Sequence, residues 1–194
     1  MSYTAQIEAA SVSSCQESDN CARVLLEVLP VTFMPEEFEV PTLLETDRFR
    51  MRPITVHDVI KDYDAVITSA EHLRSALPWG WPPEDLTLEQ DLIDLGWHQK
   101  EFQLRSSFDY AVMSLDERRL LGCVYVDPPT KKAGFDAEVY LWVRADELGT
   151  GLEEALEETV RHWISEEWPF EKVIYPGRDL TFEQWEALPS RKER

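Results

Sequence analysis

Residues 137–164 contain the sequence pattern that most limits how this chain can fold. Seven consecutive residues, AEVYLWV (137–143), are mostly apolar, which predicts a strand. A loop that contains Gly149 and Gly151 follows, and apolar side chains then recur at helical spacing at Leu152, Leu156, Val160, Trp163 and Ile164. That spacing predicts a helix with one buried face. A strand that passes through a glycine loop into such a helix favours a fold in which helices cover a sheet.

An alternating strand and a capped helix precede this segment. Residues 48–52 alternate polar and apolar side chains, which is the period of a half-buried strand. Thr55 and Asp58 are spaced as a capping box, so we expect a helix to begin at Thr55. Its apolar side chains continue at steps of three and four as far as Leu77, where the LPWGWPP loop predicts its end.

A second helix and a hairpin are predicted after this loop. Thr87 and Gln90 form another capping box, and we expect the helix to end near residues 105–107. Its apolar side is expected to hold Leu92, Ile93, Leu95 and Trp97. Residues 108–115 and 120–126 are predicted to be two strands around a turn, and residues 172–176 a last short strand.

The order of these elements predicts an α+β fold. Strand, helix, helix, three antiparallel strands, helix and strand give a mostly antiparallel mixed sheet that is covered by helices. The chain has 194 residues, enough for one domain, which we place at residues 43–194. Residues 1–42 are predicted to be an N-terminal tail and leader segment, polar up to about residue 22 and then apolar, with the leader lying against the domain.

The net charge limits which partners the chain can bind. Lys and Arg number 19 against 38 Asp and Glu, which gives a formal charge of −19. Binding to nucleic-acid phosphates or to an anionic membrane needs a basic surface that releases counterions, so we predict neither partner. A cationic partner, such as an amine, a polyamine or a basic peptide, suits this negative field better.

The cysteines point to a reduced compartment. Cys15, Cys21 and Cys123 are too few, and odd in number, for a disulfide framework. There is no Cys-x-x-Cys pair or closely spaced His–Cys cluster, so no metal site is predicted. The first residues have neither the basic start nor the apolar core of a signal peptide, and no apolar run approaches the roughly 20 residues of a membrane helix. We therefore expect a cytoplasmic protein.

Four stretches of the chain carry a resemblance to a known family: LETDRFRMRPIT (44–55), LPWGWPP (77–83), LLGCVYV (120–126) and AEVYLWVRADELGTGLEEAL (137–156). On these stretches the chain resembles the GCN5-related N-acetyltransferase (GNAT) superfamily. The likeness is strongest to the subgroup that contains ribosomal-protein and small-amine acetyltransferases, and it spans roughly residues 43–177. It implies the GNAT fold and acetyl transfer from acetyl-coenzyme A to an amine.

The resemblance places the cofactor where the strand at 137–143 passes into the following helix. There, backbone N–H groups and the helix dipole can bind a diphosphate, and glycines allow close approach. The family pattern is Arg or Gln, two residues, Gly, one residue, and Gly or Ala, and both glycines are present here. A Gly-x-Gly before a helix is also ordinary turn chemistry. By resemblance, diphosphate would bind the amides of Leu148, Gly149, Thr150, Gly151 and Leu152, and pantetheine the strand edge at Leu141, Trp142 and Val143.

The chain also departs from the family pattern. Asp146 stands where the family has Arg or Gln. Glu153 and Glu154 lie in the first helical turn, where they repel an anionic cofactor, and the candidates to offset them are Arg144, Lys131 and Lys132. The family continues with a helix and two strands, and a Tyr on that helix protonates the departing thiolate. From Arg178 only 17 residues remain here and none is Tyr, so we expect the C-terminal elements to be truncated.

A few side chains are candidates for the chemistry of acetyl transfer. A carboxylate beside the cofactor is the usual base, and Glu138 stands where many family members place it. Its alternative role is a solvated carboxylate at the start of a strand. Tyr140 and Tyr175 are candidate proton donors, or else core aromatics. Trp79 and Trp81 are candidates for a substrate-facing wall on which cations stack, or for a plug that packs the loop against the sheet.

Two functions are consistent with these residues. The first is a cytoplasmic enzyme that transfers an acetyl group from acetyl-coenzyme A directly to a primary amine of a small molecule or a protein N-terminus. The second is a catalytically weak or inactive binding or regulatory module that keeps the GNAT fold, which the departures above favour. A poorly covered sheet edge at residues 172–176 makes a homodimer a further expectation.

Overall fold

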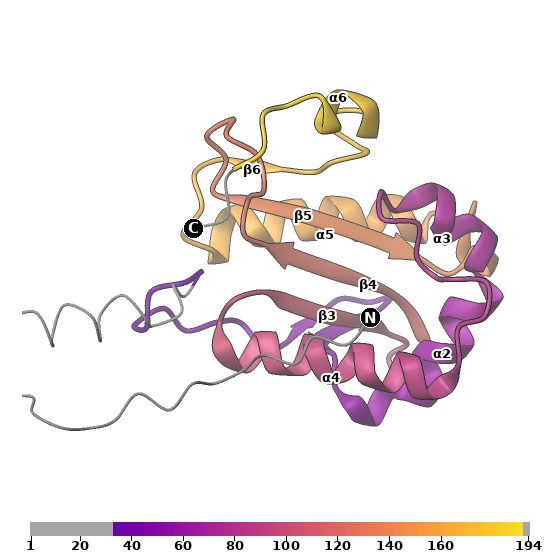
Figure 1. The fold of residues 1–194 in the computed structure, drawn as a ribbon. Coiled ribbons are helices and arrows are strands. Elements are labelled where there is room, and N and C mark those ends of the chain that lie inside the picture. The colour runs from indigo at the N-terminus through magenta and orange to yellow at the C-terminus, as the bar shows by residue number, and fades with distance from the viewer. Residues whose placement is uncertain (1–32, 192–194) are drawn as a thin grey trace, which may run out of the picture. The chain divides into compact units, whose positions relative to one another are not determined.

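Within residues 33–191, which the structure describes, six strands form one sheet in the order in which they occur in the chain (Figure 1). In this computed structural model, neighbouring strands are antiparallel except the last pair, which is parallel. The mostly antiparallel α+β prediction is therefore confirmed. The strands are β1 (Leu44–Glu45), β2 (Arg50–Pro53), β3 (Phe108–Met113), β4 (Leu120–Asp127), β5 (Ala137–Val143) and β6 (Val173–Ile174). The predictions for residues 1–32 lie outside the described residues.

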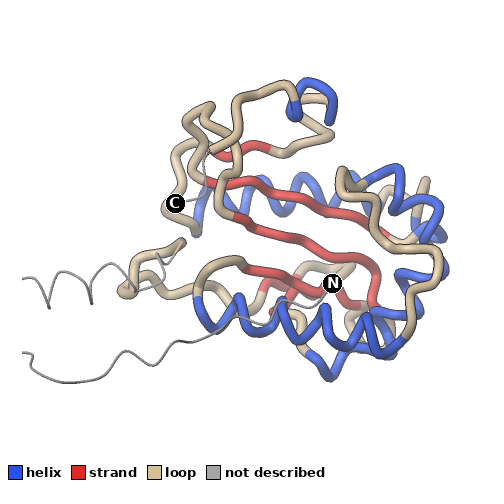
Figure 2. The backbone as a smooth tube through the Cα atoms, in the orientation of Figure 1, coloured by secondary structure: helices blue, strands red, loops and turns tan. Residues whose placement is uncertain are grey.

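Helices cover both faces of the sheet (Figure 2). The apolar stripe predicted for residues 152–164 is buried, and α5 (Leu152–Glu167) packs through it on the face that carries Val139, Leu141 and Val143. The opposite face, with Cys123 and Trp142, packs against α2 (Val59–Thr68), α3 (Ala70–Ala76) and α4 (Leu88–Leu104). Because strand side chains alternate between faces, each strand contributes to both layers. The short helix α6 (Phe182–Glu186) follows β6.

The described part of the leader lies against the domain. The Phe33 amide donates a hydrogen bond to the Arg105 carbonyl at 2.9 Å, and the Tyr110 hydroxyl donates to the Pro41 carbonyl at 2.7 Å. Met34 is buried in the same apolar cluster as the stripe of α5. Residues 33–42 therefore add apolar surface to the α5 side of the sheet.

The single helix predicted from Thr55 to Leu77 is divided in the structure. Thr55 and Asp58 do form the capping box, but it opens the 3-10 helix η1 (Val56–Asp58), and a break at Ser69 then separates α2 from α3. Ser69 is buried, and its Oγ accepts a hydrogen bond from the Ala145 amide at 2.9 Å. A contact with a residue 76 positions away decides this break, so local periodicity could not predict it.

The apolar side predicted for α4 was wrong. Leu92, Ile93 and Trp97 are 42%, 56% and 64% exposed, and of the four predicted residues only Leu95 is buried. Thr87 and Gln90 form the predicted capping box, and the helix ends at Leu104 as expected. The side that faces the sheet instead carries Asp91, Leu95, His98 and Phe102, which alternate polar and apolar types.

The strands β5 and β6 separate after a very short pairing. Their register contains only the pairs Ala137–Val173 and Glu138–Ile174, so within the described part of the chain the rest of β5 has no strand partner on that side. After β5 the chain forms the 3-10 helix η2 (Ala145–Glu147) and a loop, and then enters α5. No helix among residues 33–191 combines the length and apolar character that crossing a membrane requires.

Candidate functional site

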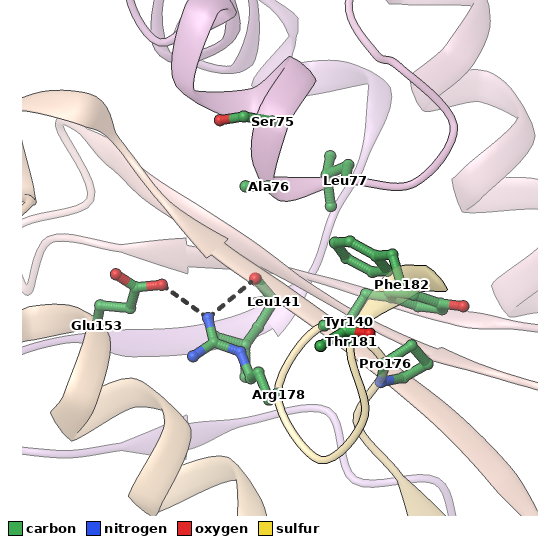
Figure 3. Close-up of a pocket in the computed structure, with 11 residues that line it drawn as sticks. Ser75, Ala76, Leu77, Tyr140, Leu141, Glu153, Pro176, Arg178, Thr181 and Phe182 are labelled. Atoms are coloured by element: carbon green, nitrogen blue, oxygen red, sulfur yellow. Dashed lines mark hydrogen bonds and ion pairs between the residues drawn. The ribbon is translucent and has the colours of Figure 1, made fainter. Parts of the chain in front are cut away.

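A cavity of about 370 Å³, here called the β5 cavity, opens where β5 and β6 separate (Figure 3). Tyr140 and Leu141 of β5 line one side, and residues 75–77 at the end of α3 line another. The segment after β6 closes it with Pro176, Gly177, Arg178, Thr181 and Phe182. Gly177 has φ +85°, and a Cβ at this position would lie 2.5 Å from the Phe182 ring. Only glycine allows this turn to pack so closely.

The unpaired edge of β5 borders this cavity at Tyr140 and Leu141. The Leu141 carbonyl accepts a hydrogen bond from Arg178 Nη2 at 3.5 Å, as the dashed lines in Figure 3 show. No strand pairs with residues 139–143 on this side among the described residues. An extended ligand with amide groups can therefore bind here as an added strand would.

The loop between β5 and α5 has two glycines in the left-handed region. Gly149 has φ +74° and Gly151 φ +77°, and the space beside the Gly149 Cα is open. The Arg48 guanidinium donates hydrogen bonds to the carbonyl oxygens of Gly151 and Thr150, at 2.7 and 3.3 Å. These two carbonyls therefore point toward Arg48. Of the five amides predicted to bind diphosphate, three already have partners within the segment, those of Leu148, Thr150 and Leu152. Hydrogen bonds among residues 33–191 leave the amides of Gly149 and Gly151 unused.

The acidic start of α5 is balanced by Arg178, which sequence reasoning did not select. Arg178 donates to Glu153 at 2.8 Å and also to Glu157. Two of the three candidates named for this purpose have other partners: Arg144 pairs with Asp64 and Asp146, and Lys131 with Glu186. Lys132 forms no ion pair within residues 33–191 and does not line the β5 cavity. The only sequence signal for Arg178 was a basic residue shortly after the last strand, which is too common to be informative.

Glu138 and Tyr140 are brought together on the face of β5 opposite α5. The Tyr140 hydroxyl donates to Glu138 Oε2 at 3.0 Å, while Thr130 donates to Oε1 through its amide and its hydroxyl. Glu138 is 1% exposed. Burial and the neighbouring Glu138 charge raise the pKa of Tyr140 well above its usual value. Glu138 is therefore not the solvated strand-start carboxylate of the alternative interpretation. It is buried, and both of its oxygens accept hydrogen bonds.

Tyr175 is not brought together with these two residues. It is buried in the apolar cluster on the α5 side, and the Arg161 guanidinium stacks 3.8 Å from the centre of its ring. Burial raises its pKa to about 12. Tyr175 does not line the β5 cavity or either of the cavities described next.

Two further cavities lie beside Tyr140 on the face opposite α5. The Trp185 cavity, of about 460 Å³, shares Tyr140 with the β5 cavity, and the Trp81 cavity has about 320 Å³. Trp79 lines both and meets the Tyr140 ring edge-on at 5.0 Å. Among residues 33–191 neither lining contains a Lys or Arg, although His98 lines the Trp81 cavity. Each lining contains several carboxylates, which together are Asp94, Glu101, Asp109, Asp127, Glu138 and Glu186. Trp79 and Trp81 therefore line acidic cavities.

Comparisons with known proteins identify the fold. No protein-family model matches the chain, and no curated protein matches its sequence. A ribosomal-protein-S5-alanine acetyltransferase from Vibrio fischeri is similar in structure, with a TM-score of 0.55 and 16% identity over 70% of this chain and 73% of that chain. The chain has the GNAT acetyltransferase fold. The fold implied by the sequence resemblance is therefore confirmed.

Two other solved structures share this acetyltransferase fold. A GnaT-family acetyltransferase from Bordetella pertussis has a TM-score of 0.52 and 18% identity over 70% of this chain and 77% of that chain. A ribosomal L7/L12 alpha-N-protein acetyltransferase in complex with coenzyme A has a TM-score of 0.51 and 14% identity over 62% of this chain and 67% of that chain. At these identities the likeness concerns the fold.

In this acetyltransferase fold, one histidine is held between carboxylates. His98 Nδ1 lies 2.7 Å from Asp109 and Nε2 lies 3.2 Å from Asp94. Burial lowers the pKa of His98, but the two hydrogen bonds outweigh it and raise the pKa to about 11. His98, Glu101 and Asp109 place possible ligand atoms within 4.8 Å of one another. The raised pKa favours the imidazolium form of His98, which is held by ion pairs with Asp94 and Asp109.

Sequence reasoning also missed Asp127, the last residue of β4. Ser107 Oγ donates to Asp127 Oδ1 at 2.5 Å. Burial and the charge of Asp109 raise the pKa of Asp127 to about 7. Asp127 is followed by two prolines and resembles any polar residue at a strand end. Only the packing of β3, β4 and α4 gives it a place between two cavities.

Proposed function

We propose that this protein is an acyltransferase that transfers an acetyl group from acetyl-coenzyme A directly to a primary amine of a small molecule or a protein N-terminus. The observation that carries the proposal is the β5 cavity, where the unpaired edge of β5 lies near Glu153 in the first turn of α5, the helix that the glycine loop enters. This arrangement can bind an extended amide chain and an anionic group at the same time.

The residues present fit the cofactor. The β5 edge at Leu141 to Val143 would hydrogen-bond the pantetheine arm, and the amides of Gly149 and Gly151 would bind the diphosphate. Arg178 neutralises the carboxylate of Glu153, which would otherwise repel the diphosphate. The cofactor supplies an activated thioester, so the protein needs only to orient it, polarise its carbonyl and remove a proton from the amine.

The Trp185 and Trp81 cavities would bind a cationic amine. Their carboxylates favour a positive charge, and the exposed faces of Trp79 and Trp81 can stack on a cation. Tyr140 lines both the β5 cavity and the Trp185 cavity, so the two substrates would meet at Tyr140. We propose that Tyr140 protonates the departing thiolate and that Glu138 orients its hydroxyl. Tyr175 was the other candidate proton donor. Because it is buried in the core on the α5 side, we do not propose this role for it.

Two of the charges that favoured a non-catalytic module, those of Asp146 and Glu153, are paired in the structure. Asp146 pairs with Arg119 and Arg144, and Glu153 pairs with Arg178. The anionic cofactor would therefore meet ion pairs where the sequence showed unopposed carboxylates. We therefore propose an active acetyltransferase rather than a non-catalytic binding or regulatory module.

Calorimetric titration of acetyl-coenzyme A into the protein, with free coenzyme A alongside, tests the proposal. We expect binding in the micromolar range. The absence of both binding heat and a thermal shift at millimolar cofactor would overturn the proposal. When binding is found, n-butylamine, 1,4-diaminobutane and spermidine follow as acceptors, with thiol release as the readout.

The homodimer and the cytoplasmic location also remain proposals. β6, with two residues, is an edge of the sheet and offers backbone groups to a second chain. Light scattering across a concentration series measures the dimer. A constant monomer mass at high protein concentration would contradict it.

A further inference from the structure

Asp127 lies where the two acidic cavities meet. Four residues line both the Trp185 cavity and the Trp81 cavity: Trp79, Glu101, Ser107 and Asp127. Asp127 is the last residue of β4 and is paired in register with Glu138 of β5. Glu138 in turn precedes Tyr140 by two residues on the same strand. An amine that approaches Tyr140 through the Trp185 cavity therefore passes a wall that contains Asp127.

The hydrogen bonds of the two carboxylates differ. Glu138 accepts from three donors and uses both of its oxygens. Asp127 Oδ1 accepts from Ser107, and its other oxygen has no hydrogen-bond partner in residues 33–191. Glu138 is 1% exposed and both of its oxygens already accept hydrogen bonds, whereas Asp127 has one oxygen that accepts none within the described part of the chain and is available to a substrate.

Charged groups on every neighbouring element act on Asp127. Asp109 on β3 and Glu138 on β5 raise its pKa, while Ser107 and the His98 imidazolium lower it. Glu101 of α4 lines both cavities with it, and Glu186 of α6 lines the Trp185 cavity. The resulting pKa near neutrality suits a general base at physiological pH.

From this geometry we propose that Asp127 is the general base of the acyl transfer and that Ser107 is its positioning residue. The inference rests on the proposed acyltransferase function. The ammonium proton moves to the available Asp127 oxygen, and the freed nitrogen lone pair attacks the thioester carbonyl carbon. A C–N bond forms, the C–S bond breaks, and the thiolate takes a proton from Tyr140. The nitrogen loses its second proton to solvent, Tyr140 regains one from solvent, and Asp127 releases the ammonium proton to solvent, so that one proton is released in each turnover.

Steady-state kinetics of Asp127→Asn and Glu138→Gln, followed by thiol release, separate the two carboxylates. The substrates are acetyl-coenzyme A and whichever of n-butylamine, 1,4-diaminobutane and spermidine the wild type acetylates. We expect Asp127→Asn to lower kcat/KM at pH 7 by about 100-fold, since a general base contributes that order or more. Glu138→Gln should lose less than about 10-fold, because a retained carboxylate at Asp127 still accepts the proton. Asp116→Asn, on the exposed turn between β3 and β4, is the matched control and should match the wild type.

A weakly basic acceptor distinguishes a base from a binding group. Trifluoroethylamine is largely unprotonated at pH 7, so its acetylation should be much less sensitive to Asp127→Asn. An equal loss with both kinds of amine would overturn the base role.

The Ser107 variants test the positioning role. Ser107→Ala should move the acid limb of the kcat/KM profile to higher pH, because the hydrogen bond that lowers the pKa of Asp127 is lost, and Ser107→Thr should restore the limb. An unmoved limb would overturn the role of Ser107.

The outcomes distinguish this inference from the proposed function. Cofactor binding and thiol release in the wild type, with undiminished release by Asp127→Asn, would overturn the inference alone. A wild type that binds no cofactor and acetylates none of the amines would overturn both. Cofactor affinity and the melting temperature of Asp127→Asn should equal or exceed those of the wild type, which shows that the variant is folded.

Discussion

Asp127 on β4 and Glu138 on β5 stand opposite each other in the antiparallel register, and the charge of Glu138 helps to raise the pKa of Asp127. Glu138 is stabilised by three donors from Thr130 and Tyr140. Its charge adds to that of Asp109 in raising the pKa of Asp127. The two residues therefore form one electrostatic unit at the junction of the cavities.

Removing the Glu138 charge should make Asp127 more acidic. In Glu138→Gln the acid limb of the kcat/KM profile is expected to move by roughly half a unit to lower pH, because one of the negative neighbours is lost. The pH dependence of thiol release measures this shift. A limb that stays in place would show that the two carboxylates are not coupled.

A bulky side chain in the glycine loop should block cofactor binding. Gly149 has open space beside its Cα, so Gly149→Trp would fill the region where the diphosphate is proposed to bind. We expect at least a 10-fold loss of acetyl-coenzyme A affinity in calorimetry, about 1.4 kcal/mol or more. Gly134→Trp is the matched control, because Gly134 also has a positive φ and open space but lies in the loop before β5. Equal affinities for the two variants would contradict this placement of the diphosphate.

Loss of the Arg178 side chain should weaken binding through charge. Arg178→Gln leaves Glu153 and Glu157 without this cation, and we expect roughly 10-fold weaker acetyl-coenzyme A binding, with a larger effect at low salt. The double variant Arg178→Gln/Glu153→Gln should recover most of the affinity. Arg161→Gln removes another Arg partner of Glu157 outside the cavity and should bind normally. Tighter binding by Arg178→Gln would instead mean that Arg178 obstructs the β5 edge.

The buried Asp91 should make the protein less stable as pH rises. Both of its carboxylate oxygens are buried without a hydrogen-bond partner among the described residues, and burial raises its pKa to about 6. Because the folded state holds this proton more tightly than the unfolded chain, wild-type stability falls between about pH 4 and pH 6 and then levels off. Asp91→Asn lacks this loss, so its stability relative to wild type should rise by on the order of 2 kcal/mol between pH 4 and pH 7. Urea unfolding at both pH values measures it, and parallel curves would contradict it.

Patterns formed by neighbouring residues predicted the fold well. The capping boxes at Thr55, Thr87 and their partners are present, and the strand at 137–143 has the predicted bounds. The apolar side of α4 was misread because its inward side includes two polar residues, the buried Asp91 and His98, which is held by Asp109 of β3. Hydrophobic periodicity cannot identify a polar residue that is buried against another polar residue.

The sequence by itself determined the strand, glycine loop and helix at 137–164, because hydrophobic period and glycine spacing act over a few neighbouring residues. Only the tertiary structure decided which charged groups meet. It placed Arg178 against Glu153, bonded Glu138 to Thr130 and Tyr140, and brought Ser107 within 2.5 Å of Asp127. Burial and Coulomb interactions depend on distance in space, and these partners come from separate strands, loops and helices.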